Sequence, residues 1–310
     1  MIGPTESEVS VDERSVEFPA HDGYRIAGTL YRRRDHLAAD EVLLFNGGGG
    51  LAVRRYRYLL RFLALQGFPV LAYDYRGVGA SRPERLRGFV AGFEDWSEFD
   101  HAGAIDDIRT RFPNARLTTV SHSVGCLIAC CAPNASDQDR MVLIAPHTGY
   151  WRDYAQPWKL PMALMWHGFM PLVARVVGYF PGGRIGIGDD FPLRFALQWS
   201  GRTTPDFRLD PRDARAWTLL GNADALCVPV MALSFSDDAF SGPAGVARLL
   251  SLLPLAQITT CQLDARKLGR RIGHFGFFSR RNDELWRAIP QFLRRTLSRD
   301  VRDYSRFGTG

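Results

Sequence analysis

The residues best suited to chemistry lie between Leu117 and Cys131, in the stretch LTTVSHSVGCLIACC. An apolar, β-rich run meets Ser-His-Ser-Val-Gly, and a fully apolar segment follows at once. A strand, a sharp turn and a buried helix in this order expose a serine at the apex of the turn as a nucleophile. Crowding at the turn requires small residues two positions before and after Ser123. Ser121 and Gly125 meet that requirement, although glycine is the common residue at the first of these positions.

A serine hydroxyl is a weak nucleophile at neutral pH and needs a general base, which in turn needs a carboxylate to orient it. Among the seven histidines, His274 is the best candidate base, because it lies in a glycine-rich loop after the last predicted strand. His122 adjoins Ser123, but its side chain should point away from the nucleophile at such a turn. His167 lies in a tryptophan-rich region and is expected to be a packing or pocket residue.

The acid is expected after the strand that precedes the last one, where Asp237 and Asp238 are adjacent. Counting from the start of that strand, Asp238 reaches the usual depth beyond the strand end, and Asp237 remains the alternative acid. Nucleophile elbows on parallel sheets are followed along the chain first by the acid and then by the histidine. The order Ser123, Asp238, His274 therefore predicts a Ser-His-Asp triad.

Attack by a serine on an acyl carbon creates an oxyanion, which preorganised N–H groups must stabilise. One donor is expected to be the backbone amide of Val124, at the helix start directly after the nucleophile. The other is expected from the turn at 46–49, with Gly48 as the first choice and Gly47 as the second, because glycine allows a close approach to the backbone. The glycine run is not a phosphate-binding loop, since Leu51 follows it without Gly-Lys-Ser/Thr.

A regular alternation of elements positions these residues. From residue 41 onward the pattern is strand, helix, strand, helix, strand, helix, strand, which predicts a mostly parallel, doubly wound sheet with helices on both faces. Ligands of such sheets bind beyond the carboxyl ends of the strands, where the candidate residues lie. The predicted strands are Ser15–Pro19, Tyr24–Arg32, Glu41–Phe45, Pro69–Tyr73, Leu117–Val120, Met141–Ile144, Val228–Phe235 and Ile258–Leu263. The predicted helices include Arg54–Leu65, Ser97–Phe112, Gly245–Leu253 and Asp283–Leu297.

Residues 148–221 interrupt this alternation, and five of the seven tryptophans fall among them. We predict an inserted cap of mostly short helices over the carboxyl edge of the sheet, which can shape an apolar pocket and exclude water. A structural insertion without substrate contact is the alternative. The core then comprises residues 15–147 and 222–298, and residues 1–14 and 299–310 are predicted to be terminal tails.

The motifs at the strand ends and in the predicted cap resemble those of a known superfamily. The chain looks like an α/β-hydrolase and, more narrowly, resembles the bacterial capped "predicted α/β hydrolase" family, related to the serine aminopeptidase and lysophospholipase-like group. The resemblance covers about residues 16–297 and implies a metal-free serine hydrolase or a relative of one. A serine at the apex disfavours the branches with an aspartate nucleophile. The matching segments are Tyr73–Ser81, His122–Gly125, Gly149–Arg152, Gly178–Gly182, Leu233–Asp238 and Ile272–Phe278.

The composition limits the other possibilities. The net charge of +6 comes almost entirely from scattered arginines interleaved with acids, so nucleic-acid binding is not expected. The five cysteines show no metal spacing or disulfide framework, which predicts buried thiols in a cytoplasmic protein. The polar, acidic N-terminus predicts no signal peptide. The apolar stretch at 160–174 is shorter than the roughly 20 residues of a membrane span, so no transmembrane span is expected.

Three functions are consistent with these residues. The first is hydrolysis of a carboxylic ester or thioester of an apolar acyl substrate through an acyl-enzyme, with no cofactor. The second is acyl transfer to an alcohol or amine by the same triad, because water and acceptor differ only in access. The third is a non-catalytic binding protein on the same fold, which a missing triad member would favour.

Overall fold

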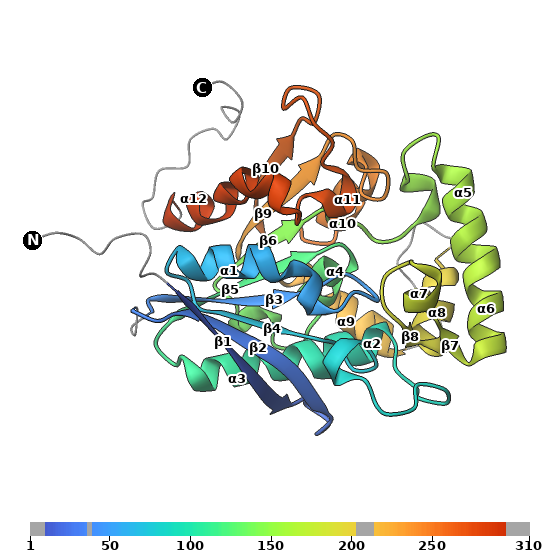
Figure 1. Ribbon diagram of the computed structural model, residues 1–310, viewed down its shortest axis with the longest axis horizontal. Helices are drawn as coiled ribbons and strands as arrows, with labels where there is room; N and C mark the ends of the chain where they lie inside the picture. Colours follow the sequence, from blue (N-terminus) through green and yellow to red (C-terminus); the bar gives the residue numbers. More distant parts are fainter. Residues whose placement is uncertain (1–9, 36–38, 203–213, 296–310) are drawn as a thin grey trace, which may run out of the picture.

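The computed structural model describes residues 10–35, 39–202 and 214–295. An eight-stranded sheet runs through the centre in the order β1-β2-β4-β3-β5-β6-β9-β10 (Figure 1). Strand β2 is antiparallel to β1 and β4, and the other neighbouring pairs are parallel. The strands are β1 (Val11–Pro19), β2 (Arg25–Arg33), β3 (Glu41–Asn46), β4 (Val70–Tyr73), β5 (Arg116–His122), β6 (Arg140–Ile144), β9 (Pro229–Phe235) and β10 (Gln257–Leu263).

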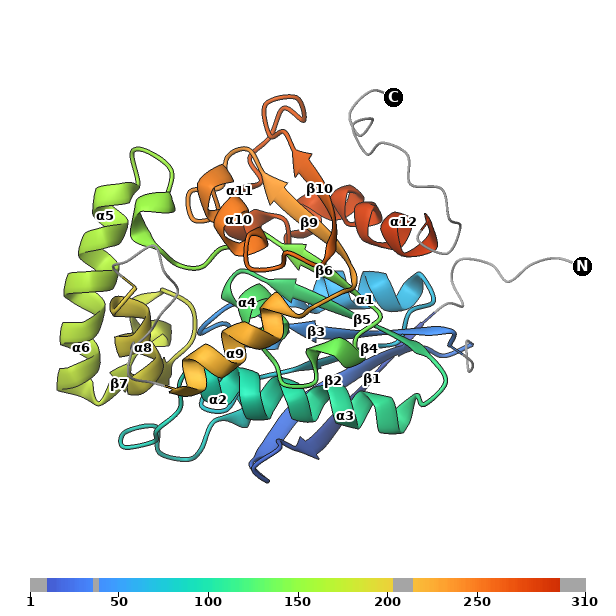
Figure 2. The same cartoon turned by 180° about the vertical axis from the view of Figure 1, so that it is seen from behind.

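Helices cover both faces of the sheet (Figures 1 and 2). In β3, Val42 and Leu44 face a core shared with α3, α4, α9 and α10, whereas Leu43 and Phe45 face a second core shared with α1 and α12. Burial on both faces explains why the parallel strands are continuous apolar runs rather than alternating ones. The helices are α1 (Arg57–Leu65), α3 (Ala102–Arg111), α4 (Val124–Cys130), α9 (Ala214–Asp224), α10 (Pro243–Leu250) and α12 (Ala288–Arg295).

The ends of several elements differ from the sequence prediction. Strand β1 begins at Val11, inside the predicted tail, because Val11 pairs with Arg33 of β2. Its polar side chains face outward at the sheet edge. The start of the strand therefore lacks the apolar pattern by which strands are predicted from the sequence. Residues 1–9 and 299–310 of the predicted tails lie outside the described residues. The shorter elements are η1 (Val53–Tyr56), η2 (Gly79–Ser81), α2 (Phe93–Asp95), η3 (Trp96–His101), η4 (Ala135–Asp137), α11 (Gly273–Gly276) and η7 (Arg280–Arg287).

The connection from β6 to β9 stands at one end of the sheet (Figure 2). It is mainly helical, as predicted, but also holds a two-stranded antiparallel sheet that the sequence did not indicate. Helix α9 differs from the rest, since Leu219 and Ala223 belong to the core under the sheet. A separate cap domain at 148–221 stays a prediction. The elements are η5 (Trp151–Asp153), α5 (Lys159–Ala163), η6 (Leu164–Phe169), α6 (Met170–Val177), β7 (Tyr179–Phe180), α7 (Gly182–Ile185), β8 (Phe191–Pro192) and α8 (Leu193–Ser200).

Elements α5, η6 and α6 form one continuous helix from Lys159 to Val177. By length and composition alone this helix could cross a membrane, and one such helix is a weak indication. It is longer than the stretch at 160–174 seen in the sequence, because it also includes Lys159 and continues through Arg175 to Val177. Its side chains Trp166 and Met170 line the cavity described below.

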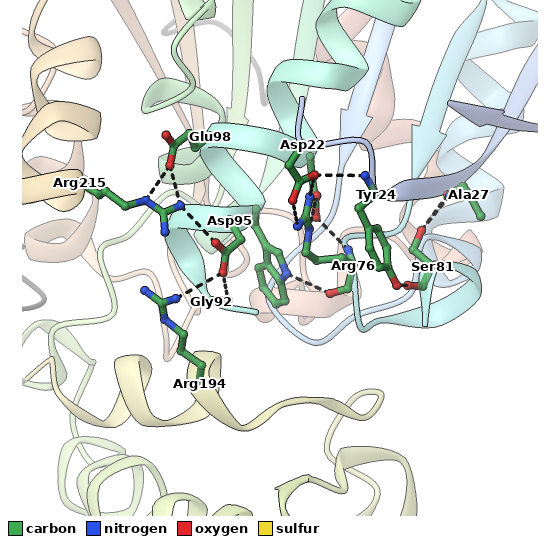
Figure 3. Close-up of polar contacts among 12 residues, drawn as sticks. Asp22, Tyr24, Ala27, Arg76, Ser81, Gly92, Asp95, Glu98, Arg194 and Arg215 are labelled. Atoms are coloured by element: carbon green, nitrogen blue, oxygen red, sulfur yellow. Dashed lines mark hydrogen bonds and ion pairs between the residues drawn. The ribbon is translucent and has the colours of Figure 1, made fainter. Parts of the chain in front are cut away.

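Buried ion pairs hold the loop after β4 against the turn between β1 and β2 (Figure 3). The Arg76 guanidinium donates to both carboxylate oxygens of Asp22, at 2.6 and 2.7 Å, and through Nε to Asp100 at 2.6 Å. The backbone amide of Arg76 also donates to Asp100, at 2.9 Å. The contacts between Arg76 and Asp100 fix the loop after β4 relative to the helical stretch that begins at Phe93.

A second set of ion pairs joins α8 and α9 to that helical stretch (Figure 3). Arg215 donates to Glu98 at 2.8 Å and to Asp95 at 3.1 Å, and Arg194 lies 3.8 Å from Asp95. Asp95 also accepts from the amide of Gly92, at 2.8 Å. The β6–β9 connection is therefore anchored to the core by charged contacts as well as by apolar packing.

Replacing Asp100 by asparagine is expected to lower the free energy of unfolding by about 3 kcal/mol, since removing one partner of a buried pair is strongly destabilising. The carboxylate of Asp100 is fully buried, whereas Asp22 is one-third exposed. Asp22→Asn should therefore cost about 1 kcal/mol, as for a partly exposed pair. Urea denaturation of the two variants measures the difference, and equal losses would contradict the larger contribution expected from the buried carboxylate of Asp100.

Candidate active site

Ser123 lies at the sharp turn between β5 and α4, as predicted. Its φ of 58° and ψ of −130° fall in a region that residues other than glycine rarely occupy. Its amide donates to the carbonyl of Ile144 on the neighbouring strand β6, at 2.9 Å. Ala145, directly after β6, is the other non-glycine residue with a positive φ in the described part of the chain. The two strained residues stand side by side at the carboxyl edge of the sheet.

The crowding at this turn explains the residues around Ser123. A Cβ atom on Gly125 would lie 2.4 Å from the carbonyl oxygen of Gly47, so only glycine fits there. Ser121 is fully buried, and its hydroxyl donates to the side chain of Asn46 at 2.5 Å. Asn46 in turn donates to the carbonyl of Gly125 at 2.8 Å. Serine at 121 is thus accommodated by a hydrogen bond that ties the turn to the end of β3.

The structure brings Ser123, His274 and Asp238 into one chain of hydrogen bonds. The Oγ atom of Ser123 lies 2.9 Å from Nε2 of His274, and Nδ1 of His274 lies 2.8 Å from Oδ2 of Asp238. The other carboxylate oxygen accepts from the amides of Phe240 and Ser241, at 2.8 and 2.9 Å. Burial alone would raise the pKa of Asp238, but His274 and the two amides lower it to about 2. Because Asp238 is ionised, Nδ1 of His274 carries the proton and Nε2 is free to accept one from Ser123.

The other candidate residues lie around this chain without joining it. Asp237 accepts hydrogen bonds from the amides of Ile272 and Gly273, both at 2.9 Å, so it anchors the loop that carries His274. His122 donates through Nε2 to the carbonyl of His274 at 3.1 Å and accepts from the Tyr56 hydroxyl. Both contacts support the His274 loop from beneath.

His167 lies away from these residues, on the long helix Lys159–Val177. Its Nδ1 atom donates to the carbonyl of Ser200 at 2.6 Å. This hydrogen bond joins η6 to α8, which makes His167 a packing contact of the β6–β9 connection.

The sequence did not single out His147, yet its Nε2 atom lies 3.0 Å from Oγ of Ser123. The side chain is almost completely buried and follows the strained turn at Ala145. Its Nδ1 atom accepts from the amide of Gly149 at 3.1 Å. Burial, reinforced by His274, lowers the pKa of His147 to about 3, so the ring is neutral at physiological pH. Two histidines therefore contact the same serine oxygen.

The two predicted oxyanion donors differ in their surroundings. Val124 begins α4, and the first amides of a helix have no partner within it. The amide of Gly48 donates to the Tyr56 hydroxyl at 2.9 Å. The next amide, of Gly49, makes no hydrogen bond within the described residues, and Gly49 borders the same cavity as Val124.

A cavity of about 840 Å³ opens above Ser123. Ser123, His147 and His274 form its polar floor. Its walls are mostly apolar, and the β6–β9 connection contributes Trp166, Met170, Phe191, Phe195 and Trp199 to them. The other wall residues come from the core and include Arg55, Arg280 and Arg281. A deep apolar pocket with a few convergent polar groups is the usual form of a small-molecule site.

Within residues 10–35, 39–202 and 214–295, no cluster of three or more His, Cys, Asp or Glu side chains could hold a metal ion. All five cysteines are free thiols. Four of them are buried, as expected, and Cys227 is exposed.

Comparison with known proteins agrees with this geometry. The model of the serine aminopeptidase S33 family matches residues 38–179, which hold β3 to β6 and the serine turn. An esterase of Pyrococcus furiosus is 15% identical with a TM-score of 0.60, over 95% of each chain. A monoacylglycerol lipase of Paleococcus ferrophilus is 16% identical with a TM-score of 0.55, over 91% of this chain and 98% of its own.

A thioesterase domain of the curacin biosynthetic pathway is 16% identical with a TM-score of 0.51, over 91% of this chain and 99% of its own. No curated protein matches the sequence. At such low identities the similarity defines the fold and leaves the substrate open. The strand order, the serine turn and these comparisons establish that the chain is an α/β-hydrolase by fold, similar over residues 38–179 to the serine aminopeptidase S33 family.

Proposed function

We propose that the protein is a serine hydrolase that cleaves a carboxylic ester or thioester of an apolar acyl substrate through an acyl-enzyme. The observation that carries this proposal is the hydrogen bond from Ser123 to Nε2 of His274 at the floor of the apolar cavity. A serine in a strained turn, bonded to a histidine that a buried carboxylate orients, has the parts of an acyl-transfer site.

In the proposed reaction, Oγ of Ser123 attacks the acyl carbon while its proton moves to Nε2 of His274. The carbonyl electron pair moves to oxygen, and the tetrahedral intermediate collapses as His274 returns the proton to the departing alcohol or thiol. Water then attacks the acyl-enzyme and gives its proton to His274. The bond to Oγ breaks, and His274 protonates Ser123 again. Asp238 keeps its negative charge throughout and stabilises the imidazolium.

The proposed oxyanion donors are the amide of Val124 and an amide of the turn after β3. Gly48, the first choice from the sequence, would have to exchange the Tyr56 hydroxyl for the substrate oxygen. Gly49 needs no such exchange within the described residues. We therefore propose Gly49 in place of Gly48 as the second donor.

The aromatic side chains of the cavity wall support an apolar acyl group, and Arg55, Arg280 and Arg281 are charged side chains of the same wall. Trp166, Met170, Phe191, Phe195 and Trp199 of the β6–β9 connection form part of the wall, which supports a role for the proposed cap in substrate binding. The absence of disulfides among the five thiols is compatible with a cytoplasmic location, which remains a prediction.

The proposal is tested by treating the protein with a fluorophosphonate and measuring its intact mass. We expect one adduct, which peptide mapping places on Ser123, and no adduct on the Ser123→Ala variant. Wild-type protein that stays unmodified while correctly folded would contradict the proposal and favour a binding protein. Turnover of a p-nitrophenyl ester with and without added alcohols or amines then separates hydrolysis from acyl transfer by the products.

A further inference from the structure

We infer that His147 is a second catalytic histidine, a hydrogen-bond donor to Oγ of Ser123 that stabilises negative charge on this atom whenever it attacks or leaves. This inference rests on the proposed function, because it assigns a role to a residue of the same site. Its basis is the contact of 3.0 Å between Nε2 of His147 and Oγ of Ser123.

The hydrogen bonds of His147 determine where its proton lies. The amide of Gly149 can only donate, so Nδ1 of His147 accepts and carries no hydrogen. A neutral imidazole has one N–H group, which must then be on Nε2. Because the pKa of His147 is lowered to about 3, the doubly protonated ring is not populated at neutral pH. The group that faces Ser123 is therefore an N–H donor and not a base.

The two histidines thus have opposite roles toward the same oxygen. Ser123 donates its hydroxyl proton to Nε2 of His274 and accepts a hydrogen bond from Nε2–H of His147. When the proton moves to His274, negative charge develops on Oγ, and a preorganised donor in a buried site stabilises that charge. During deacylation Oγ is the leaving atom, and the same donor assists its departure. His147 keeps its proton in both steps.

The backbone around His147 is built to hold this geometry. Ala145 has a φ of 49°, and Gly149 has a φ of 82°. A Cβ atom on Gly149 would lie 2.9 Å from the ring of Trp199, so this position requires glycine. The carbonyl of Pro146 accepts from the hydroxyl of Ser241, at 2.7 Å. Since the amide of Ser241 binds Asp238, the turn that carries His147 is tied to the turn that carries the acid.

Three substitutions separate the donor role from a structural one. His147→Gln keeps an N–H near the Nε2 position but loses the acceptor for Gly149. His147→Asn keeps that acceptor but cannot reach Ser123, and His147→Phe loses both. The measured quantities are the second-order rate constant of fluorophosphonate labelling and kcat/KM with p-nitrophenyl butyrate, with circular dichroism to verify the fold.

We expect His147→Asn and His147→Phe to be about 10- to 100-fold slower than wild type, in the range for losing one donor to a developing charge. His147→Gln should retain most of the rate. Equal rates for all variants, or slow Gln and Phe variants beside a fast Asn variant, would overturn the inference, the second result indicating that only the Gly149 contact matters. If wild-type Ser123 is not labelled at all, the proposed function itself fails. Should the Phe variant not fold, the Gln and Asn pair still decides.

Discussion

Replacement of Asp238 by asparagine is expected to lower kcat for p-nitrophenyl ester hydrolysis by about 10⁴-fold, the loss seen when the triad histidine is held in the wrong tautomer. The amides of Phe240 and Ser241 already donate to one oxygen of Asp238. They would hold the carbonyl oxygen of the asparagine, so its NH₂ group would face Nδ1 of His274. That nitrogen would then accept, the ring proton would move to Nε2, and His274 could no longer take the proton of Ser123.

Asp237→Asn is the matched control, because it changes the neighbouring carboxylate in the same way. Among the residues that the structure describes, its oxygens accept from the amides of Ile272 and Gly273 alone, so it positions the loop without touching the imidazole of His274. We expect its kcat to fall by at most about 10-fold, as for loss of one exposed, charge-assisted hydrogen bond. A larger loss for Asp237→Asn than for Asp238→Asn would exchange the roles of the two acids.

The arrangement of Ser123, Asp238 and His274 could be predicted because Ser123 and Asp238 closely follow apolar runs and His274 lies in the glycine-rich loop after the last one. Parallel strands place their carboxyl ends at one edge of the sheet, so residues separated by up to about 150 positions meet there. The small residues around Ser123 added a steric signal that depends only on neighbours in the sequence. The central sheet and the alternation of its helices were predictable for the same reason.

His147 could not be assigned from the sequence, although one signal was available. It follows β6, and β6 pairs directly with β5, which carries the serine turn. A histidine at that position therefore lies at the right edge of the sheet. The position of its side chain beside Ser123, however, depends on the positive φ of Ala145. Alanine rarely adopts a positive φ, so the sequence does not indicate this conformation.

The proposed change of oxyanion donor from Gly48 to Gly49 could not be derived from the sequence for a different reason. It depends on the hydroxyl of Tyr56, which reaches back to the glycine run from η1 and binds both Gly48 and His122. Tyr56 lies eight positions after Gly48, and the sequence indicates only a core residue there, because its apolar ring accounts for its burial. Hydrogen bonds made by the polar tip of a buried aromatic side chain follow from packing and are not encoded in a local pattern.

The His101→Asn variant is expected to resist acid better than wild type. Burial lowers the pKa of His101 to about 3, so between about pH 6.5 and pH 3 the unfolded chain binds a proton that the folded chain does not. Stability therefore falls as the pH falls through this range, by about 1.4 kcal/mol per pH unit for one such group. Between pH 6.5 and pH 3.5 the free energy of unfolding of wild type should therefore fall by about 4 kcal/mol more than that of the variant.

The comparison between variant and wild type isolates His101 from the other buried groups. Glu41 and Asp74 have pKa values raised by burial and act in the opposite sense, but they are present in both proteins and cancel in the difference. Asparagine can accept the hydrogen bond of the Tyr73 hydroxyl that Nδ1 of His101 now makes at 2.8 Å, so the variant keeps that contact. At pH 7 it should be less stable than wild type, because a buried ring is lost.

Urea denaturation of both proteins across this pH range gives the slope of unfolding free energy against pH for each. Parallel slopes would mean that the pKa of His101 does not differ between the folded and the unfolded chain. The burial of a neutral His101 would then not be a source of acid sensitivity.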